Sequence, residues 1–336
     1  MQDHNPNVAA VVLNCNGKKW LDCCLRTLSG GDYPNLTIYL SDNASTDDSP
    51  EWVEKNYPSV KVLKNMQNLG WAGGNNVGIR PALNDGADWV WILNNDIELE
   101  RDCLSRMMDF IRQNPHIKML TPIINYFEPR DRVWSCGGTI DYKGCEARLY
   151  ERIEDFKLNP ENRILSGCAL MVHKDVFRKI GLIDECFFIY GEDWDFCVRA
   201  DNAGFKMDVA DSALMYHKVG AYSAGADSMN AWKNYQFLRG SLIFWRRHLG
   251  FWRFHRNYCP GHLYKWFGAL NDEQGKRTDV NDAIIDALWY FLTFKRCPRD
   301  WPKSPSWFRQ LVRRRGWAII ELMSFRLGSL ARARPT

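Results

Sequence analysis

The sequence predicts an α/β fold built on a doubly wound, mostly parallel sheet with flanking helices. Two nearly continuous apolar runs, residues 8–14 and 89–93, are typical of strands buried on both faces of such a sheet. Helical patterns fill the intervals between these runs and further strand candidates, and alternation at this spacing indicates βαβ units. Polar residues cluster after the runs, at the sheet edge where ligands bind in open α/β folds.

The chain has 336 residues, enough for two domains or for one large domain with an appendage. We place a sheet-containing domain at residues 1–245 and a mainly helical region at residues 246–336. The second region holds 18 Lys and Arg against 7 Asp and Glu, whereas the whole chain has a net charge of only +4. Residues 1–245 therefore hold 26 Lys and Arg against 33 Asp and Glu, so the first region is negatively charged and the second positively charged. Opposite net charges indicate that the two regions serve different purposes.

The sequence also indicates a compartment. The first seven residues, MQDHNPN, are polar, so we expect no signal peptide, and no apolar run approaches the roughly 18 residues of a membrane span. Eleven cysteines form no CxxC pair, and an odd count without framework spacing indicates reduced thiols. We therefore expect a cytosolic protein.

Acidic and amide side chains follow the run at residues 89–93. Asn94, Asn95 and Asp96 come directly after it, and Glu98 is two residues further on. A bend just past the strand would aim Asp96 and Glu98 at one hard cation, of the kind that bridges protein carboxylates to substrate phosphates. The alternative, a capped loop with solvated acids, is open at this point.

A segment rich in glycine and asparagine, residues 68–78, leads into a predicted helix. It does not match GxGxxG and follows the third strand rather than the first, so a dinucleotide fingerprint is not expected. We expect Gly73 and Gly74 to let the backbone approach a ligand closely, with a helix N-terminus nearby to favour anions. Loop geometry alone is the competing interpretation.

Three acids, Glu192, Asp193 and Asp195, stand at the head of another predicted helix. They gain from the helix dipole, and this stabilisation accounts for some of them. The aromatic residues before them place the acids beside apolar surface, where the pKa of a carboxylate can be adjusted for work as a base. His217 follows a strand directly, and a structural role or a metal-binding role fits it equally well.

Four ordered segments together resemble glycosyltransferase family 2, the inverting, nucleotide-sugar-dependent enzymes of GT-A fold. The segments are SDNASTDDS at 41–49, NLGWAGGNNVGI at 68–79, LNNDIELE at 93–100, and the pair SGCALMVHKDVF and FFIYGEDWDFCVRA between 166 and 200. The chain is most similar to the rhamnosyltransferase and galactofuranosyltransferase-like branch, over about residues 8–250. By this resemblance, residues 1–245 are a GT-A nucleotide-sugar-binding and catalytic domain.

The resemblance implies a role for each matching residue. Asp193 matches the catalytic base, with Glu192 beside it, and Trp194 is expected to pack against a sugar. The metal-binding positions, for Mg²⁺ or Mn²⁺, are Asp96, Glu98 and His217. The nucleotide-binding positions are Asn14, Asp42, Asn43, Asn68, Gly73, Asn75, Asn94 and Asn95.

Two departures from the family pattern affect these expectations. Asn94 and Asn95 replace carboxylates of a full DxD motif, so we expect modest metal affinity and a larger share for Glu98 and His217. Residues 236–240 lack the Trp of the QxxRW motif found in processive synthases. We therefore do not expect polymerisation through a membrane channel.

The implied function is inverting transfer of a sugar from dTDP-L-rhamnose or a UDP-sugar to a hydroxyl of a saccharide or lipid-linked saccharide. The setting implied is bacterial cell-surface polysaccharide assembly. A non-catalytic nucleotide- or glycan-binding relative is the alternative, because Asn94 and Asn95 weaken DxD. A nucleotidyltransferase is not expected, because the loop after the first strand is too short for a phosphate loop.

The basic C-terminal region interleaves aromatic and basic residues, as in residues 244–248 and 251–256. Helices of this composition lie on membrane surfaces, and the best amphipathic candidates are residues 283–294 and 307–330. Peripheral contact with the inner face of the cell membrane would suit a lipid-linked acceptor. Nucleic acid is a rival partner that we do not expect. Packing on the catalytic domain, or on a second subunit in a homo-oligomer, is open.

Overall fold

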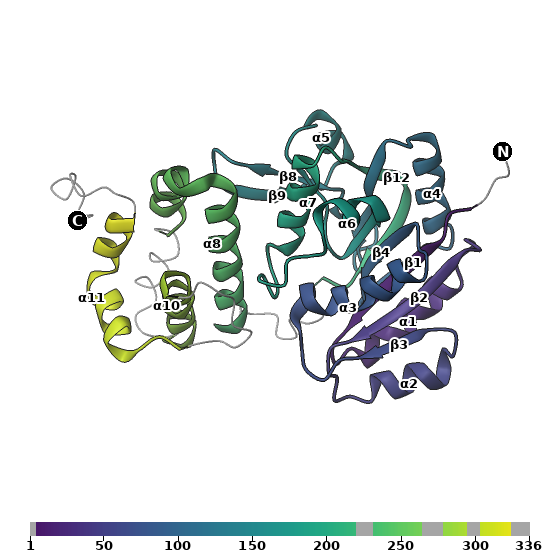
Figure 1. The fold of residues 1–336 in the computed structure, drawn as a ribbon, viewed down its shortest axis with the longest axis horizontal. Coiled ribbons are helices and arrows are strands. Elements are labelled where there is room, and N and C mark those ends of the chain that lie inside the picture. The colour runs from purple at the N-terminus through teal and green to yellow at the C-terminus, as the bar shows by residue number, and fades with distance from the viewer. Residues whose placement is uncertain (1–4, 220–230, 264–277, 294–302, 324–336) are drawn as a thin grey trace. The chain divides into compact units, whose positions relative to one another are not determined.

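The computed structural model describes residues 5–219, 231–263, 278–293 and 303–323, which fall into two compact units (Figure 1). The first unit comprises residues 1–140, 147–188 and 192–226, and the second comprises residues 141–146, 189–191 and 227–336. The boundary predicted at residue 245 lies inside helix α8 (Ala231–Arg253), so the compact units divide earlier, near residue 226.

A large mixed sheet forms the centre of the first unit. Its strands follow the order β3-β2-β1-β4-β11-β6-β12-β5, and β7 pairs with β6. Their bounds are β1 Val8–Asn14, β2 Leu36–Asp42, β3 Lys61–Lys64, β4 Trp89–Asn94, β5 Ile97–Leu99, β6 Ile117–Tyr126, β7 Val133–Ser135, β11 Ala169–His173 and β12 Lys206–His217. A separate three-stranded sheet has the order β10 (Arg163–Ile164), β8 (Gly138–Asp141) and β9 (Glu146–Leu149). The predicted α/β class is confirmed.

The parallel half of the large sheet aligns the polar strand ends. β1 runs parallel to β2 and β4, with Asn14 in register with Asp42 and Leu13 in register with Asn94. The ends of three strands therefore meet at one edge, as the sequence pattern predicts. β11 lies antiparallel between β4 and β6. Because Ala169 at the start of β11 is in register with Leu93, the residues just before β11 lie near the polar end of β4.

Helices cover both faces of this sheet, so the apolar runs are buried on both sides (Figure 1). α1 (Lys18–Ser29), α2 (Ser49–Asn56) and α4 (Cys103–Gln113) pack into one core cluster with alternate residues of β1, including Ala10. On the other face, α3 (Gly70–Asn84) packs on β1 through Gly78, where a Cβ would lie 2.5 Å from Val11 Cγ1. The remaining helices of the unit are α5 (Ile153–Leu158), α6 (Lys174–Ile180) and α7 (Glu192–Asn202).

From residue 231 onward the second unit is mainly helical where it is described, as predicted for the C-terminal region. It contains α8, the π-helix η2 (Phe254–Leu263), α10 (Thr278–Thr293) and α11 (Ser306–Met323); residues 324–330 of the predicted amphipathic helix lie outside the described residues. α11 is tied to α10 by Arg309, whose guanidinium donates to the buried Asp286 at 2.9 and 3.1 Å. In the described part of the chain, no helix is long and apolar enough to cross a membrane. The ten described cysteines are free thiols.

Candidate active site

Asn14 and Asp42 form the first layer of the site, at the ends of β1 and β2. Asn14 Nδ2 donates to Asp42 Oδ1 at 2.8 Å and to Ser49 Oγ at 2.7 Å. Asp42 also accepts from Ser45, whose Oγ lies 2.6 Å from Oδ1 and whose backbone N lies 3.0 Å from Oδ2. Burial with several hydrogen bonds holds the Asp42 carboxylate in one orientation at the strand end.

A second amide extends this network to the end of β4. Asn95 is fully buried, and its Nδ2 donates to Asn14 Oδ1 at 2.6 Å. A carboxylate only accepts hydrogen bonds, so Asp42 fixes which way the Asn14 amide faces, and Asn14 in turn fixes Asn95. A carboxylate at position 95 would set oxygen against oxygen at Asn14. The amide at position 95 is therefore a structural requirement of this chain, and it explains one departure from DxD.

Asp96 and His217 form a pair that suits a divalent cation. His217 Nε2 lies 3.2 Å from Asp96 Oδ1, both side chains are buried, and Asp96 Oδ1 accepts no hydrogen bond within the described residues. Adjacent ligands of an octahedral cation with bonds of about 2.1 Å lie about 3.0 Å apart. The backbone holds the pair in place, since Lys218 N donates to Asp96 O at 2.9 Å. These two residues fit a cation that completes its shell with water and phosphate oxygens.

Glu98 is not brought to this pair, which corrects the predicted set of three ligands. Its Oε2 accepts from Arg130 Nη2 at 2.7 Å and from Cys23 Sγ at 3.5 Å. Burial works to raise the pKa of Glu98, but the bond and charge of Arg130 outweigh it and lower that pKa. Over the described ranges, no three His, Cys, Asp or Glu side chains gather as a metal site. We therefore leave Glu98 out of the proposed metal site.

Asp193 lies in the first turn of α7 with both carboxylate oxygens held by backbone amides. Gly167 N donates to Oδ2 at 3.1 Å and Trp194 N donates to Oδ1 at 2.9 Å. Burial raises the pKa of Asp193, against the two amide bonds, which lower it. The side chain keeps partial exposure, and Glu192 beside it is buried. Gly167 was not predicted, because a backbone donor leaves no signal in residue types.

Asp195, in contrast, has a structural role. Its fully buried carboxylate accepts from Arg199 Nε at 2.7 Å, four residues along α7. The same guanidinium donates to Ile180 O at 2.9 Å and to Leu182 O at 3.1 Å, which anchors the loop after α6. Of the three acids at the head of α7, Asp195 therefore serves the fold. Trp194, partly exposed in the same turn, stays a predicted sugar contact.

Asp96 and Asp193 lie at one place in the first unit. Asn94 N donates to Cys168 O at 3.1 Å, and the neighbouring Gly167 N bonds to Asp193. Burial raises the pKa of the Cys168 thiol to about 12, and the charges of Asp96 and Asp193 both add to the rise. Residues 167 and 168 thus link the segment that carries Asp96 to Asp193. A single pocket shared by the two acids stays a prediction.

A family model described as glycosyl transferase family 2 matches residues 9–181, just over half of the chain. This chain belongs to that family. It is 28% identical over 237 residues to N-acetylglucosaminyl-diphospho-decaprenol L-rhamnosyltransferase of Mycobacterium tuberculosis, covering 62% of this chain and 74% of that protein. It is 24% identical to dTDP-rhamnosyl transferase RfbF of Shigella flexneri, covering 67% and 74%. The protein is therefore a glycosyltransferase.

The fold agrees with this membership. The mannosyltransferase PcManGT from Pyrobaculum calidifontis, solved with GDP-Man and Mn²⁺, superimposes with a TM-score of 0.53 at 16% identity. The match covers 88% of this chain and 89% of that one. S. aureus TarS 1-349 in complex with UDP-GlcNAc gives a TM-score of 0.53 at 17% identity, over 84% and 80% of the two chains. The predicted GT-A architecture is confirmed.

The glycines of the family 2 segment at residues 68–79 make room for protein rather than for a ligand. Gly73 and Gly74 both lie inside α3. A Cβ at Gly74 would lie 2.4 Å from Leu13 Cδ1, and one at Gly73 would lie 2.9 Å from Leu69 Cβ. The N-terminal amides of α3 are also occupied, since Trp71 N donates to Phe188 O at 2.6 Å. The anion site expected at this helix N-terminus is therefore not available.

Asparagines brace the same segment. Asn43 Nδ2 donates to Gly70 O at 2.8 Å and its Oδ1 accepts from Leu69 N at 3.3 Å, while Asn68 Oδ1 accepts from Gly70 N at 2.8 Å. Asn75 is buried and donates to the Trp71 carbonyl at 2.9 Å, but its Oδ1 has no partner within the described residues. A direct nucleotide contact by any of these side chains stays a prediction.

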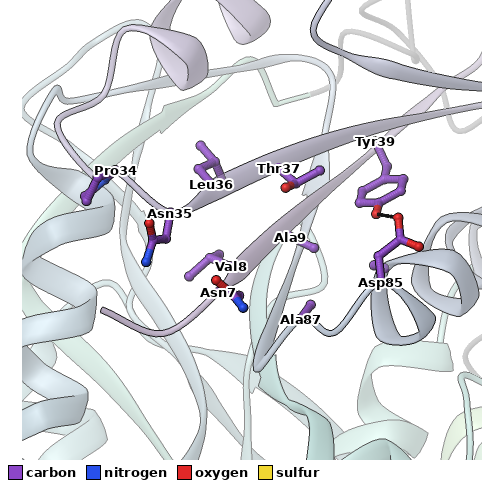
Figure 2. Close-up of a pocket in the computed structure, with 11 residues that line it drawn as sticks. Asn7, Val8, Ala9, Pro34, Asn35, Leu36, Thr37, Tyr39, Asp85 and Ala87 are labelled. Atoms are coloured by element: carbon purple, nitrogen blue, oxygen red, sulfur yellow. Dashed lines mark hydrogen bonds between the residues drawn. The ribbon is translucent and has the colours of Figure 1, made fainter. Parts of the chain in front are cut away.

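A hollow of about 350 Å³ lies at the opposite end of β1 and β2 (Figure 2). Val8, Leu36 and Thr37 line it from the two strands, and Tyr39 and Asp85 close one side. Tyr39 Oη donates to Asp85 Oδ2 at 2.6 Å, and Lys61 Nζ donates to the same oxygen at 2.6 Å. None of the predicted site residues lines this hollow.

Proposed function

We propose that the protein is an inverting glycosyltransferase that moves a sugar from a nucleoside-diphosphate donor to a hydroxyl of a saccharide acceptor. L-Rhamnose on dTDP is the first candidate donor and a UDP-sugar is the second. Two relatives that are named as L-rhamnosyl or dTDP-rhamnosyl transferases support this order. The observation that carries the proposal is the backbone link between the two acids: Asn94 N, two residues before Asp96, donates to Cys168 O, and the neighbouring Gly167 N donates to Asp193 Oδ2.

Asp193 is the proposed base. The acceptor oxygen bonds to the anomeric carbon while the bond from that carbon to the diphosphate oxygen breaks. The electron pair of the broken bond leaves with the nucleoside diphosphate, and the hydroxyl proton passes to Asp193. Its raised pKa makes Asp193 a stronger base than an ordinary aspartate, and its fixed carboxylate is aimed before the acceptor arrives. One displacement with one base inverts the anomeric carbon.

Asp96 and His217 would hold the divalent cation. Asp96 Oδ1 is a buried acceptor without a hydrogen bond in the described residues, beside the Nε2 of His217, which is the donor set that such an ion requires. When bound, a divalent cation neutralises charge on the departing diphosphate. An imidazole ligand favours Mn²⁺ over Mg²⁺, because Mg²⁺ takes oxygen ligands almost exclusively. Asp42 at the end of β2 remains the proposed nucleobase contact.

Thermal unfolding against a panel of nucleotide sugars, with Mn²⁺ or Mg²⁺, tests this proposal. A ligand raises the unfolding midpoint only if it binds the folded state. We expect dTDP-L-rhamnose with Mn²⁺ to give the largest rise, and the same donor to be consumed with inversion when a saccharide acceptor is added. Absence of a metal-dependent rise with every donor would contradict the proposal and favour the non-catalytic alternative.

The proposed acceptor is lipid-linked, because the second unit has a surface suited to a membrane. Its exposed apolar side chains include Trp252 (69% exposed) and Trp307 (58% exposed). Ring contacts of 5.5 Å between Phe254 and Phe291 join α8–η2 to α10, and Trp289 packs on Trp307 at 5.5 Å. Aromatic contacts therefore connect η2 to α10 and α10 to α11 within the second unit.

Charge on the same unit favours anionic lipid. Arg253 and Arg256 are exposed beside Trp252. The acids Asp282 and Asp286 are both paired with Arg309 and so do not offset these bases. Exposed aromatic side chains beside exposed arginines are the composition of surfaces that lie on anionic headgroups.

Co-sedimentation with vesicles containing anionic lipid tests membrane contact. The double variant Trp252→Ser/Trp307→Ser should lose most of its binding, whereas Met66→Ser, at a still more exposed apolar position in the first unit, should bind as the unmodified chain does. Equal binding by the double variant, or equal binding to uncharged vesicles, would remove this part of the proposal.

A further inference from the structure

Trp71 touches both sides of the candidate active site. It stands in the first turn of α3, and its indole Nε1 donates to Asn94 Oδ1 at 3.1 Å, at the end of β4. Its backbone N donates to Phe188 O at 2.6 Å, in the loop that leads to α7. One residue therefore joins the strand end before Asp96, through its side chain, to the segment that leads to Asp193, through its backbone.

The indole settles how the Asn94 amide faces. An indole nitrogen can only donate, so the atom it meets must be the amide oxygen of Asn94. The Asn94 amide nitrogen is consequently turned away from Trp71, and it has no partner in the described part of the chain. Asn94 is partly exposed, so this NH₂ group is open to a ligand two residues before Asp96.

The six-membered ring of the indole lies against Gly167, which donates its backbone N–H to Asp193. A Cβ added at Gly167 would lie 2.8 Å from Trp71 Cζ2 and 3.2 Å from Asp193 Cβ. The same glycine donates its N–H to Asp193 Oδ2. Only a residue without a side chain lets the ring and the carboxylate approach this closely, so the three groups form one packed unit.

We propose that Trp71 is a positioning residue that sets the separation between the donor-binding Asn94 and the base Asp193. It keeps the Asn94 NH₂ directed at an acceptor oxygen of the nucleoside-diphosphate donor, a phosphate or ribose oxygen. It also holds the Gly167 amide against Asp193. This inference rests on the proposed function, and it adds a residue that the family resemblance left without a role.

Trp71→Phe isolates the indole N–H, because the variant keeps an aromatic ring and loses only the donor and part of the ring. We expect the KM for the donor to rise about five- to tenfold, the effect of one lost hydrogen bond, while kcat changes less than about twofold. Trp52→Phe, a partly buried Trp on α2 away from the site, is the matched control and should leave both values unchanged.

A double-mutant cycle tests whether Trp71 acts through Asn94. If it does, Trp71→Phe adds little to the donor KM once Asn94→Ala is present. Trp71→Ala should in addition lower kcat and move the acid limb of the pH–kcat profile to lower pH, because water reaches Asp193 when the ring is gone. Thermal unfolding shows whether each variant is folded, and the Phe variant carries the test if the Ala variant is not.

The possible outcomes separate this inference from the proposed function. If the unmodified chain turns over no donor, the proposed function fails. If the unmodified chain is active and Trp71→Phe behaves like Trp52→Phe, or if the effects of Trp71→Phe and Asn94→Ala multiply independently, Trp71 has no positioning role. A raised donor KM that disappears in the Asn94→Ala background supports the assignment.

Discussion

The two ends of β1 and β2 differ in whether their buried polar groups have hydrogen-bond partners. The amino-terminal end has open volume, about 350 Å³, but Tyr39, Asp85 and Lys61 satisfy one another there (Figure 2). Toward the other end, a buried acceptor on Asp96 after β4 and one on Asn75 in α3 have no hydrogen bond within the described residues. An unpaired buried acceptor costs about 1–3 kcal/mol, so a fold retains it where a ligand completes it. The site at Asp96 therefore offers acceptors that a ligand can complete, whereas Tyr39, Asp85 and Lys61 at the hollow satisfy one another.

The largest effect is expected at Asp193. Asp193→Asn keeps the shape and one of the two backbone-amide contacts but removes the base, so turnover should fall by roughly 10³-fold while nucleotide binding survives. In the unmodified chain, activity should fall as the pH drops through the raised pKa of Asp193, above the ordinary value of about 3.9. Steady-state transfer rates across pH, with thermal shifts by the nucleoside diphosphate, provide the measurements.

Asp201→Asn, an exposed acid on the same helix, is the matched control and should keep full activity. Parallel loss of turnover and nucleotide binding in Asp193→Asn would show that Asp193 supports the structure instead of the chemistry.

The next largest effect is expected at Asp96, which with His217 is proposed to bind the divalent cation. Asp96→Ala should weaken Mn²⁺-dependent donor binding by roughly 10²-fold, because neutralisation of the diphosphate is worth several kcal/mol. Glu98→Gln should leave the metal dependence unchanged, since Glu98 is engaged by Arg130. Titration calorimetry of the donor with and without Mn²⁺ measures both. If Glu98→Gln abolishes metal dependence and Asp96→Ala does not, the assignment of ligands is reversed.

A smaller effect, on stability, is expected when the buried amide of Asn95 is replaced. Asn95→Asp would set a carboxylate oxygen against Asn14 Oδ1 in a fully buried position, so we expect the free energy of unfolding to fall by about 1–3 kcal/mol. Denaturant unfolding measures this change. Gln67→Glu, which makes the same amide-to-acid change at an exposed position, is the control and should leave the stability unchanged. A stability of Asn95→Asp unchanged from that of the unmodified chain would mean that the network tolerates a reversed polarity.

The smallest effect is expected at the hollow. Tyr39→Phe removes one hydroxyl and leaves the Lys61–Asp85 pair in place, so we expect a loss of about 1 kcal/mol or less in unfolding free energy. Donor KM and kcat should not change. A clear rise in donor KM would overturn the contrast between the two ends, because it would place a ligand contact in the hollow.

The sequence was sufficient to predict the edge at which the site forms. A buried apolar run that stops at a polar residue identifies both the strand and its end, and parallel pairing brings Asn14, Asp42 and Asn94 to one edge. The structural role of Asp195 was also readable, because Arg199 follows it at the four-residue spacing of a helical ion pair.

Other features depend on partners that no local pattern identifies. Arg130, which engages Glu98, lies 32 residues away in a loop, so two acids that look equivalent in sequence have different roles. The carbonyl of Phe188 occupies the N-terminus of α3 from more than a hundred residues away, which removes the predicted anion site. The helix N-terminus itself was predicted correctly, but a long-range backbone contact decided its use.

The hydrogen-bonded series from Asp42 through Asn14 to Asn95 also has a consequence for how this protein can evolve. Each amide faces the way its neighbour dictates, so an acid at position 95 would need a donor at position 14, and that donor would then be withdrawn from Asp42. A single replacement leaves two atoms of like polarity facing each other. The three positions should therefore be inherited together, and the unusual Asn-Asn-Asp sequence should persist wherever its two partners do.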